Sequence, residues 1–256
     1  MPAPIVHAGY HAEISSILRI LGTTKAHLWP FIESEGITVA GHGAAEDLAV
    51  SEAGAAEALE DDFSPIQYES GVHSYNFNPV GDHHLNGPDH ANYSFGDGST
   101  DDAFSLGAWI WPSAIASNAI IAKYDSAGNA EEYRFWIDGS GNLALELHDA
   151  SASTTETGTG GTVLTLFRPV HVVATYDGTE TAPEVHIYID AVDDLSAGTT
   201  TESGLYVAME NTATPLTIGC AGVTATPTLE FNGRIALPFL CGKALSQAEI
   251  NDVYHI

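Results

Sequence analysis

The sequence predicts an all-β protein in which two antiparallel sheets stack as a jelly-roll sandwich, with a short helix at each end. Three observations lead to this fold class. Short stretches of alternating apolar and polar residues recur along most of the chain, turns rich in Gly and Asp separate them, and helical periodicity occurs in two places only. The hydrophobic fraction of 44% is sufficient for a folded core. We therefore expect a globular protein.

The two helices are expected near the ends of the chain. Four aliphatic residues recur at the spacing of one helix face: Ile14, Ile17, Leu18 and Leu21. Gly22 follows as a stop signal, so the first helix is predicted over 11–21. Ser246 and Glu249 have the spacing of a capping box and are followed by apolar residues on one face. A second short helix should therefore close the chain.

The alternating stretches between the helices predict the strands. They cover 74–77, 92–95, 104–111, 120–124, 132–137, 143–148, 163–167, 170–176, 184–190, 216–220 and 233–240. The Gly-, Ser- and Thr-rich runs 151–161 and 198–204 are predicted to be exposed hairpin loops. The acidic stretch 44–62 is either a helix or a loop, and we favour a loop interrupted by a short strand. Cys220 and Cys241 both fall in apolar stretches, so we expect buried thiols rather than a disulfide.

The charge balance excludes several classes of function. The chain has 7 Lys and Arg against 34 Asp and Glu, a formal net charge of −27. A protein that binds nucleic acid needs cations to neutralise phosphates, so nucleic acid is not an expected partner. No apolar stretch is long enough to cross a bilayer, and the first residues lack the pattern of a secretory signal. Neither a membrane span nor Sec-dependent export is expected.

Several stretches resemble, in order and spacing, the laminin-G-like domains of the concanavalin A-like lectin/glucanase superfamily. The most specific are FSLGAWI at 104–110, VHVVATYDG at 170–178, VHIYID at 185–190 and ALSQAEI at 244–250. The opening stretch 28–36 is similar to the first strand of the same domains. The resemblance implies a laminin-G-like jelly-roll domain over 26–256, preceded by an N-terminal arm over 1–25 that carries the first helix.

A short helix directly before the opening strand is similar to the layout of laminin-G-like proteins in the virions of tailed bacteriophages. This resemblance implies a non-enzymatic structural protein located in the virion, most simply a capsid decoration or head-surface protein. Its partners would be other virion proteins, the major capsid protein or copies of itself. Ile14, Ile17 and Leu18 of the arm would dock on a partner.

An apolar patch near the C-terminus is the second candidate contact surface. Leu237 and Phe239 occupy positions where the family carries charged residues, and a monomer would have to expose them. Two explanations stay open: the patch contacts another chain, or the N-terminal helix covers it within the same chain. Both also explain the tolerance of Pro238, which we expect on an edge strand because proline cannot donate a hydrogen bond to a neighbouring strand.

The alternative function is a lectin-like module that recognises glycans on a host surface. Aromatic rings are common platforms for sugars. Trp136 is the candidate because it lies on the polar-facing register of its strand, between Arg134 and Asp138. Trp109 and Trp111 lie on a strand that is apolar on both faces, so we expect that strand to be buried.

Catalysis is not expected. Hydrolytic members of the superfamily use the strand motif Glu-x-Asp-x-x-Glu, because retaining hydrolysis needs two carboxylates close together, and no Glu here has that spacing. No cofactor is expected either. The loop 81–90 gathers five candidate metal ligands: Asp82, His83, His84, Asp89 and His90. The resemblance also allows calcium, held by Asp89, Asp97, Asp101 and Asp102, but a surface turn would favour many of the same residues.

Overall fold

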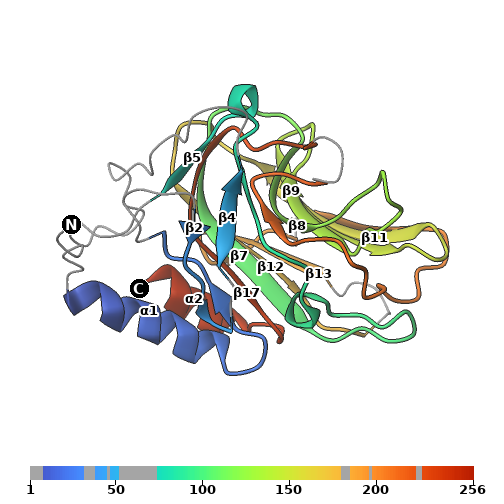
Figure 1. Ribbon diagram of the computed structural model, residues 1–256, viewed down its shortest axis with the longest axis horizontal. Helices are drawn as coiled ribbons and strands as arrows, with labels where there is room; N and C mark the ends of the chain where they lie inside the picture. The colour runs from blue at the N-terminus through green and yellow to red at the C-terminus, as the bar shows by residue number, and fades with distance from the viewer. Residues whose placement is uncertain are drawn as a thin grey trace.

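A computed structural model describes residues 8–31, 38–44, 47–51, 74–179, 185–195, 198–222 and 227–256. Two antiparallel sheets form the two layers of a sandwich, and the two helices lie together on one side of it (Figure 1). The predicted fold class is confirmed. No helix among these residues is long and apolar enough to cross a bilayer.

Sheet A is one layer of the sandwich. Its strands in spatial order are β14 (Val192–Asp193), β13 (Val185–Ile189), β12 (Val170–Tyr176), β7 (Phe104–Pro112), β17 (Gly233–Cys241), β1 (His27–Leu28) and β3 (His42–Gly43), and β5 (Tyr75–Phe77) also pairs with β17. The register places Leu106 of β7 between Ala174 of β12 and Leu240 of β17. All three residues are buried because this sheet is covered on both faces in its central part.

Sheet B is the other layer. In spatial order it contains β15 (Thr199–Ser203), β11 (Thr154–Val163), β10 (Asn142–Asp149), β9 (Tyr133–Ile137), β8 (Asn118–Lys123), β16 (Thr217–Ile218), β6 (His84–Asn86), β4 (Leu48–Ser51) and β2 (Thr38–Val39). Two short 3-10 helices, η1 (Pro79–Gly81) and η2 (Ala91–Tyr93), lie in the connections before and after β6.

The core between the sheets is rich in aromatic side chains. Phe95 and Phe104 stack with ring centres 4.5 Å apart, and Tyr133 lies against both rings. A buried ion pair lies beside this core: the Lys123 Nζ is 2.6 Å from Glu132 Oε1, and both side chains are fully buried. Lys123 Nζ also donates to the carbonyl of Thr212 and lies 3.1 Å from Asp89. The pair ties β8, β9 and two loops together.

The helices α1 (Ala8–Leu21) and α2 (Gln247–Tyr254) pack on the outer face of sheet A. Ile14, Ile17 and Leu21 of α1 are 1–4% exposed and belong to the same apolar cluster as Leu237 and Phe239 of β17. The structure therefore supports the second explanation for the apolar patch: the N-terminal helix covers it within the same chain. α1 therefore packs against the sandwich, as expected for a helix too short to be stable alone in water, and the division into an arm over 1–25 and a domain over 26–256 stays a prediction from the sequence. The predicted capping box at Ser246 and Glu249 is confirmed.

A bulge in β17 explains the tolerance of Pro238. The pairing with β7 shifts register between Ala236 and Phe239, and Leu237 has a left-handed φ of 48°. β17 is a central strand, flanked by β7 on one side and by β1 and β5 on the other, so the expected edge position is wrong. The bulge needs no hydrogen-bond donor from Pro238, and its carbonyl accepts a bond from Trp29.

The predicted strands agree with most of the observed ones but fail at four places. Residues 92–95 were expected to be extended, yet η2 forms there, capped by a bond from the Asn92 N–H to His90 Nδ1. The predicted strand 163–167 is a turn after Val163, with Phe167 at a φ of 59°. The two expected loops are strands: 151–161 overlaps β11 and 198–204 contains β15.

Two further expectations concern the acidic stretch and the cysteines. Within 44–62 the structure describes β4, in agreement with the predicted short strand, while 52–62 lies outside the described residues. Cys220 and Cys241 are both buried and free, as predicted. Burial raises the pKa of the Cys241 thiol to about 12, so it stays protonated at neutral pH.

Candidate functional site

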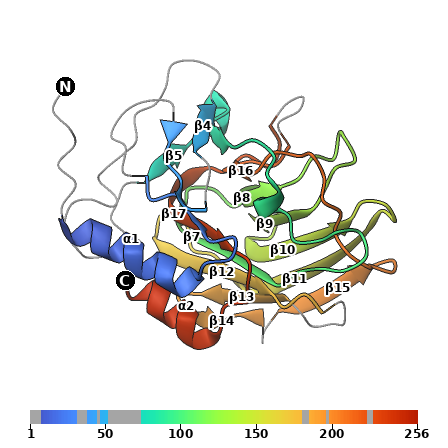
Figure 2. The ribbon, with the colours of Figure 1, turned by 60° about the horizontal axis from the view of Figure 1, so that its bottom comes forward.

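The outer face of sheet B differs from that of sheet A because neither described helix covers it. In both views α1 and α2 lie beside β17 and away from β11 (Figures 1 and 2). Two strands at the edge of this face carry rows of hydroxyl groups that pair across the strands. The pairs are Thr155 with Ser203, Thr157 with Thr201, and Thr159 with Thr199. These side chains are partly or fully exposed.

Glycines place β11 close to sheet A and leave its threonines outward. A Cβ at Gly158 would lie 2.4 Å from Val185 Cγ1, and one at Gly160 would lie 2.3 Å from Asp194 Oδ2. Side chains at these two positions would collide with β13 and the segment after it. From Thr157 to Gly160 the strand therefore alternates between outward threonines and inward glycines, and it carries no apolar periodicity.

A row of planar side chains lies on the same face, toward β8. The Arg134 guanidinium carbon is 4.3 Å from the centre of the Trp136 ring and 4.7 Å from that of Tyr124, so the cation lies against both aromatic rings. Arg134 Nη2 is 2.7 Å from Glu146 Oε1, and His148 contacts the same oxygen. We call Tyr124, Arg134, Trp136, Glu146 and His148 the planar row.

Glu146 supplies the negative charge of the planar row. Burial acts to raise the pKa of Glu146, but the bond from His148 and the charge and bond of Arg134 outweigh it, so the pKa is lowered. The carboxylate is therefore ionised at neutral pH. Burial raises the pKa of Tyr124, whose hydroxyl stays protonated and can donate a hydrogen bond. Donors and acceptors thus stand beside the hydroxyl rows on one face.

The inner side of β11 carries an unusual carboxyl group. Glu156 is 4% exposed, and Glu202 of β15 lies directly across from it. Burial raises the pKa of Glu156 to about 7, and the nearby carboxylates of Glu202, Asp101 and Asp177 add to the effect. Asp101 in turn accepts bonds from the hydroxyls of Tyr176 and Tyr206. The edge of sheet B thus encloses a carboxyl group that can be protonated near neutral pH.

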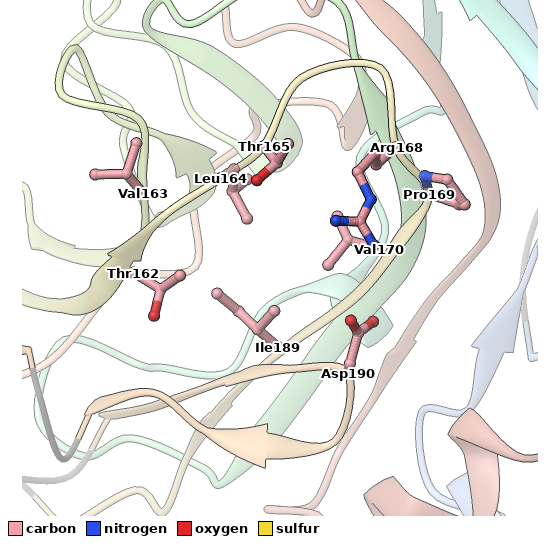
Figure 3. A pocket seen from close by; sticks show the side chains of 9 residues that line it. All are labelled: Thr162, Val163, Leu164, Thr165, Arg168, Pro169, Val170, Ile189 and Asp190. Atoms are coloured by element: carbon pink, nitrogen blue, oxygen red, sulfur yellow. The ribbon is translucent and has the colours of Figure 1, made fainter.

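A pocket of about 130 Å³ opens where the end of β11, the connection 164–169 and the turn after β13 meet (Figure 3). Its lining residues are Thr162, Val163, Leu164, Thr165, Arg168, Pro169, Val170, Ile189 and Asp190. The side chains of Arg168 and Asp190 extend toward one another in Figure 3, but no ion pair joins them. Sequence reasoning missed this pocket, because three separate segments build it.

The residues predicted for contacts lie in two different environments. Trp136 is partly exposed on the open face of sheet B, as its register indicated, and one face of its ring is taken by Arg134. Ile14, Ile17, Leu237 and Phe239 are buried together under α1, and Leu18 packs at the margin of the same cluster. In this structure the predicted docking residues pack against one another, and Leu18 among them keeps part of its surface in solvent.

The candidate metal ligands of the loop 81–90 are engaged elsewhere. His84 Nδ1 bonds to the carbonyl of Asp82, His90 accepts from the backbone of Asn92, and Asp89 pairs with Lys123. His83 and His84 are 4% exposed, and burial lowers the pKa of His84. The described residues include no group of three or more His, Cys, Asp or Glu side chains arranged to hold a metal ion. As placed, these side chains do not fit a divalent cation.

Solved structures with a similar fold come from several proteins. Domain 4 of an extracellular arabinanase from Geobacillus stearothermophilus, in complex with arabinotriose, superposes with a TM-score of 0.58 at 13% identity, over 89% of this chain and 97% of that one. Botulinum neurotoxin type C, whose cell entry depends on two ganglioside molecules, gives 0.60 at 16% identity over 93% of this chain. A Trypanosoma rangeli sialidase in complex with sialic acid gives 0.59 at 14% identity over 96% of this chain.

The chain spans 52% of that neurotoxin structure and 37% of the sialidase. At these identities the likeness shows the fold alone. No curated protein sequence matches. A family model described as the concanavalin A-like lectin/glucanases superfamily, of laminin-G type, matches residues 85–251, from β6 to α2. The chain belongs to this superfamily.

Proposed function

We propose that this chain is a non-enzymatic carbohydrate-binding domain, and that it binds glycans on the outer face of sheet B. The observation that carries the proposal is the composition of that open face. Rows of threonine hydroxyls on β11 and β15 adjoin the planar row, which supplies a cation, a carboxylate and aromatic edges.

The chemistry of this face suits an oligosaccharide. Sugar hydroxyls both donate and accept hydrogen bonds, and the face offers threonine hydroxyls for both roles, the Glu146 carboxylate to accept and Arg134 to donate. The C–H groups of a sugar ring pack against aromatic surface, which Trp136 and Tyr124 provide at the sheet. Threonines are short, so a glycan can lie along the strands without meeting long side chains.

The comparisons support a binding role for this fold. The arabinanase domain was solved with arabinotriose, the sialidase with sialic acid, and the neurotoxin is described as interacting with gangliosides. Each of those statements concerns its own protein. For this chain they favour the lectin-like function over the other reading of the sequence.

The planar row favours binding over hydrolysis. Glycoside hydrolysis by the common mechanisms needs two carboxyl groups, about 5 to 9.5 Å apart, one of them able to donate a proton. Glu146 is the one carboxylate of the row. It is ionised and held by Arg134 and His148, so it is suited to accept hydrogen bonds from sugar hydroxyls.

A glycan array followed by calorimetry on the best ligand tests the proposal. Trp136→Ala and Thr157→Val should each weaken binding, by about tenfold for the tryptophan because its aromatic contact with the sugar is lost. Thr24→Val is the matched control for the threonine, since Thr24 is exposed on the helix side of the molecule. If Trp136→Ala and Thr157→Val both leave glycan binding intact, the site lies elsewhere and the assignment to sheet B fails.

A virion role stays a prediction from the sequence. The apolar patch at Leu237 and Phe239 that suggested a docking surface lies under α1. A glycan-binding domain can still be part of a virion that attaches to a host. Counting copies of this protein in purified particles by quantitative mass spectrometry is the test, and absence from every particle would rule the role out.

A further inference from the structure

Arg168 is one of 7 Lys and Arg residues in a chain that has 34 Asp and Glu. Lys25, Lys123, Arg134 and Lys243 each form an ion pair with a carboxylate. Arg168 is exposed and forms no ion pair with any residue that the structure describes. In a molecule with such an excess of carboxylates, an arginine without one leaves its guanidinium available to a ligand.

The position of Arg168 indicates where a ligand would meet its guanidinium. Its guanidinium extends over the pocket at the end of β11, toward the Asp190 carboxylate on the opposite side (Figure 3). Asp190 is held in place because its Oδ1 accepts a bond from the His171 N–H. The space between the two charged groups is bordered by apolar side chains of Leu164, Val170 and Ile189, and by the hydroxyl of Thr165.

We propose that this pocket binds one carboxylate-bearing sugar unit of a glycan, of the hexuronic acid type; this inference rests on the proposed function. Arg168 binds the sugar carboxylate through paired charge-assisted hydrogen bonds. Asp190 accepts a hydrogen bond from a ring hydroxyl on the other side of the unit. The apolar wall packs against the C–H groups of the ring.

The paired charges narrow the class of ligand. A bare inorganic anion would satisfy Arg168 but would meet the carboxylate of Asp190. A neutral sugar would satisfy Asp190 but would leave the guanidinium without an anion. A sugar acid carries an anionic group and hydroxyl donors on one ring, so it can bridge the gap. The volume of about 130 Å³ is well below that of sites for larger ligands, so a single unit is expected.

Titration of the ¹⁵N-labelled full chain with galacturonic acid, followed by NMR chemical shifts, tests the proposal. Galactose and the methyl ester of galacturonic acid are the matched neutral probes, because they differ from it only at the carboxyl group. We expect shifts at the pocket residues with the acid, and binding at least about tenfold weaker with both neutral probes.

Two arginine variants separate the pocket from the overall charge. Arg168→Gln should reduce the affinity for galacturonic acid about tenfold or more. Arg19→Gln, on the exposed side of α1, removes the same charge and should leave the affinity unchanged. Equal losses in both variants, equal binding of acid and neutral probes, or binding of a free amino acid in place of the sugar acid would each overturn the proposal.

Failure of this pocket proposal and failure of the proposed function give different experimental results. If Arg168→Gln leaves the binding of galacturonic acid unchanged while Trp136→Ala weakens binding of a neutral oligosaccharide, the glycan site on sheet B stands without the pocket. If galacturonic acid binds through Arg168 but the Trp136 and Thr157 variants bind glycans normally, the pocket stands and the proposed site on sheet B fails.

Discussion

The two described helices cover the outer face of sheet A and leave the outer face of sheet B open. On sheet A the outward side chains include Trp109, Val173 and Phe239, and α1 and α2 cover them. On sheet B the outward side chains of β11 and β15 are threonines and serine, and the described helices leave them open. Both sheets are antiparallel and both contribute an apolar face to the core between them, so the difference comes only from the second face.

This difference shows how one architecture separates stability from binding. Apolar residues on the outer face of a sheet are unfavourable in water. The two helices therefore pack over these residues and form a second apolar cluster on that side. Polar, short outward residues have no such need, so the other sheet stays accessible. The two helices at opposite ends of the sequence meet on sheet A and leave sheet B free for a ligand.

Deleting residues 1–21 should give the largest effect, because it removes the cover of sheet A. Three aliphatic side chains of α1 are 1–4% exposed, and burying each one is worth about 1.5–3 kcal/mol. The free energy of unfolding should fall by several kcal/mol in chemical denaturation, and exposed Leu237 and Phe239 should promote aggregation. Within the helix, Ile17→Ala should cost about 2–5 kcal/mol.

Arg19→Ala is the control for the helix, since Arg19 is exposed and its loss should change stability by less than about 0.5 kcal/mol. A truncated protein with unchanged stability would mean that α1 does not stabilise sheet A. The covered face of sheet A would then contribute no more to the free energy of unfolding than the open face of sheet B.

Glu156→Gln should raise stability at the edge of the open sheet. Because the pKa of Glu156 is raised to about 7, the native state keeps a proton that the unfolded chain releases above about pH 4.5. The wild-type free energy of unfolding therefore falls as pH rises from about 4.5 to 7. The glutamine variant lacks this loss and should be more stable at pH 8 by on the order of 1–2 kcal/mol.

Glu131→Gln removes the same formal charge from the connection between β8 and β9 and serves as the control for this pH profile. Thermal unfolding at pH 5 and pH 8 is the measurement. The gain of Glu156→Gln should be present at pH 8 and small at pH 5. A gain of equal size at both pH values would show that ionisation of the buried Glu156 carboxyl is not its cause.

Glu146→Gln should have the smallest effect and the opposite sign. The pKa of Glu146 is lowered in the folded protein, so its stabilisation is complete above about pH 4.5 and is lost as pH falls through the lowered pKa. At pH 7 the variant should be less stable by about 1 kcal/mol, since a partly exposed charge-assisted bond is lost. Below pH 3 the two proteins should unfold alike; a persistent difference there would contradict the ion pair.

How well the sequence predicted each strand depended on what the strand buries. The strand β12 was predicted because its apolar residues repeat at the spacing of a buried sheet. The strand β11 was predicted as a loop because its inward positions are Glu156, Gly158 and Gly160. The two glycines are required because Val185 and Asp194 approach them closely, a tertiary contact that leaves no apolar signal in the sequence.

The candidate site shows the same limit. Trp136 could be placed on an outward register, because alternation along one strand is local information. The hydroxyl rows and the pocket could not be foreseen, since they depend on strands β11 and β15 pairing and on three distant segments meeting at Arg168 and Asp190. The cover of Leu237 by α1 was left as one of two alternatives for the same reason.

The central place of β17 has a consequence for how the chain folds as it is made. This strand begins at Gly233, yet it pairs with β1, β5 and β7 from the first half of the sequence. A ribosome releases these N-terminal partners long before it releases β17, so sheet A stays incomplete and α1 lacks Leu237 and Phe239 to pack on until β17 has been made. Pairing over such sequence separations is slow. We therefore expect the nascent chain to expose unpaired strand edges until β17 is released, and such edges are prone to aggregation.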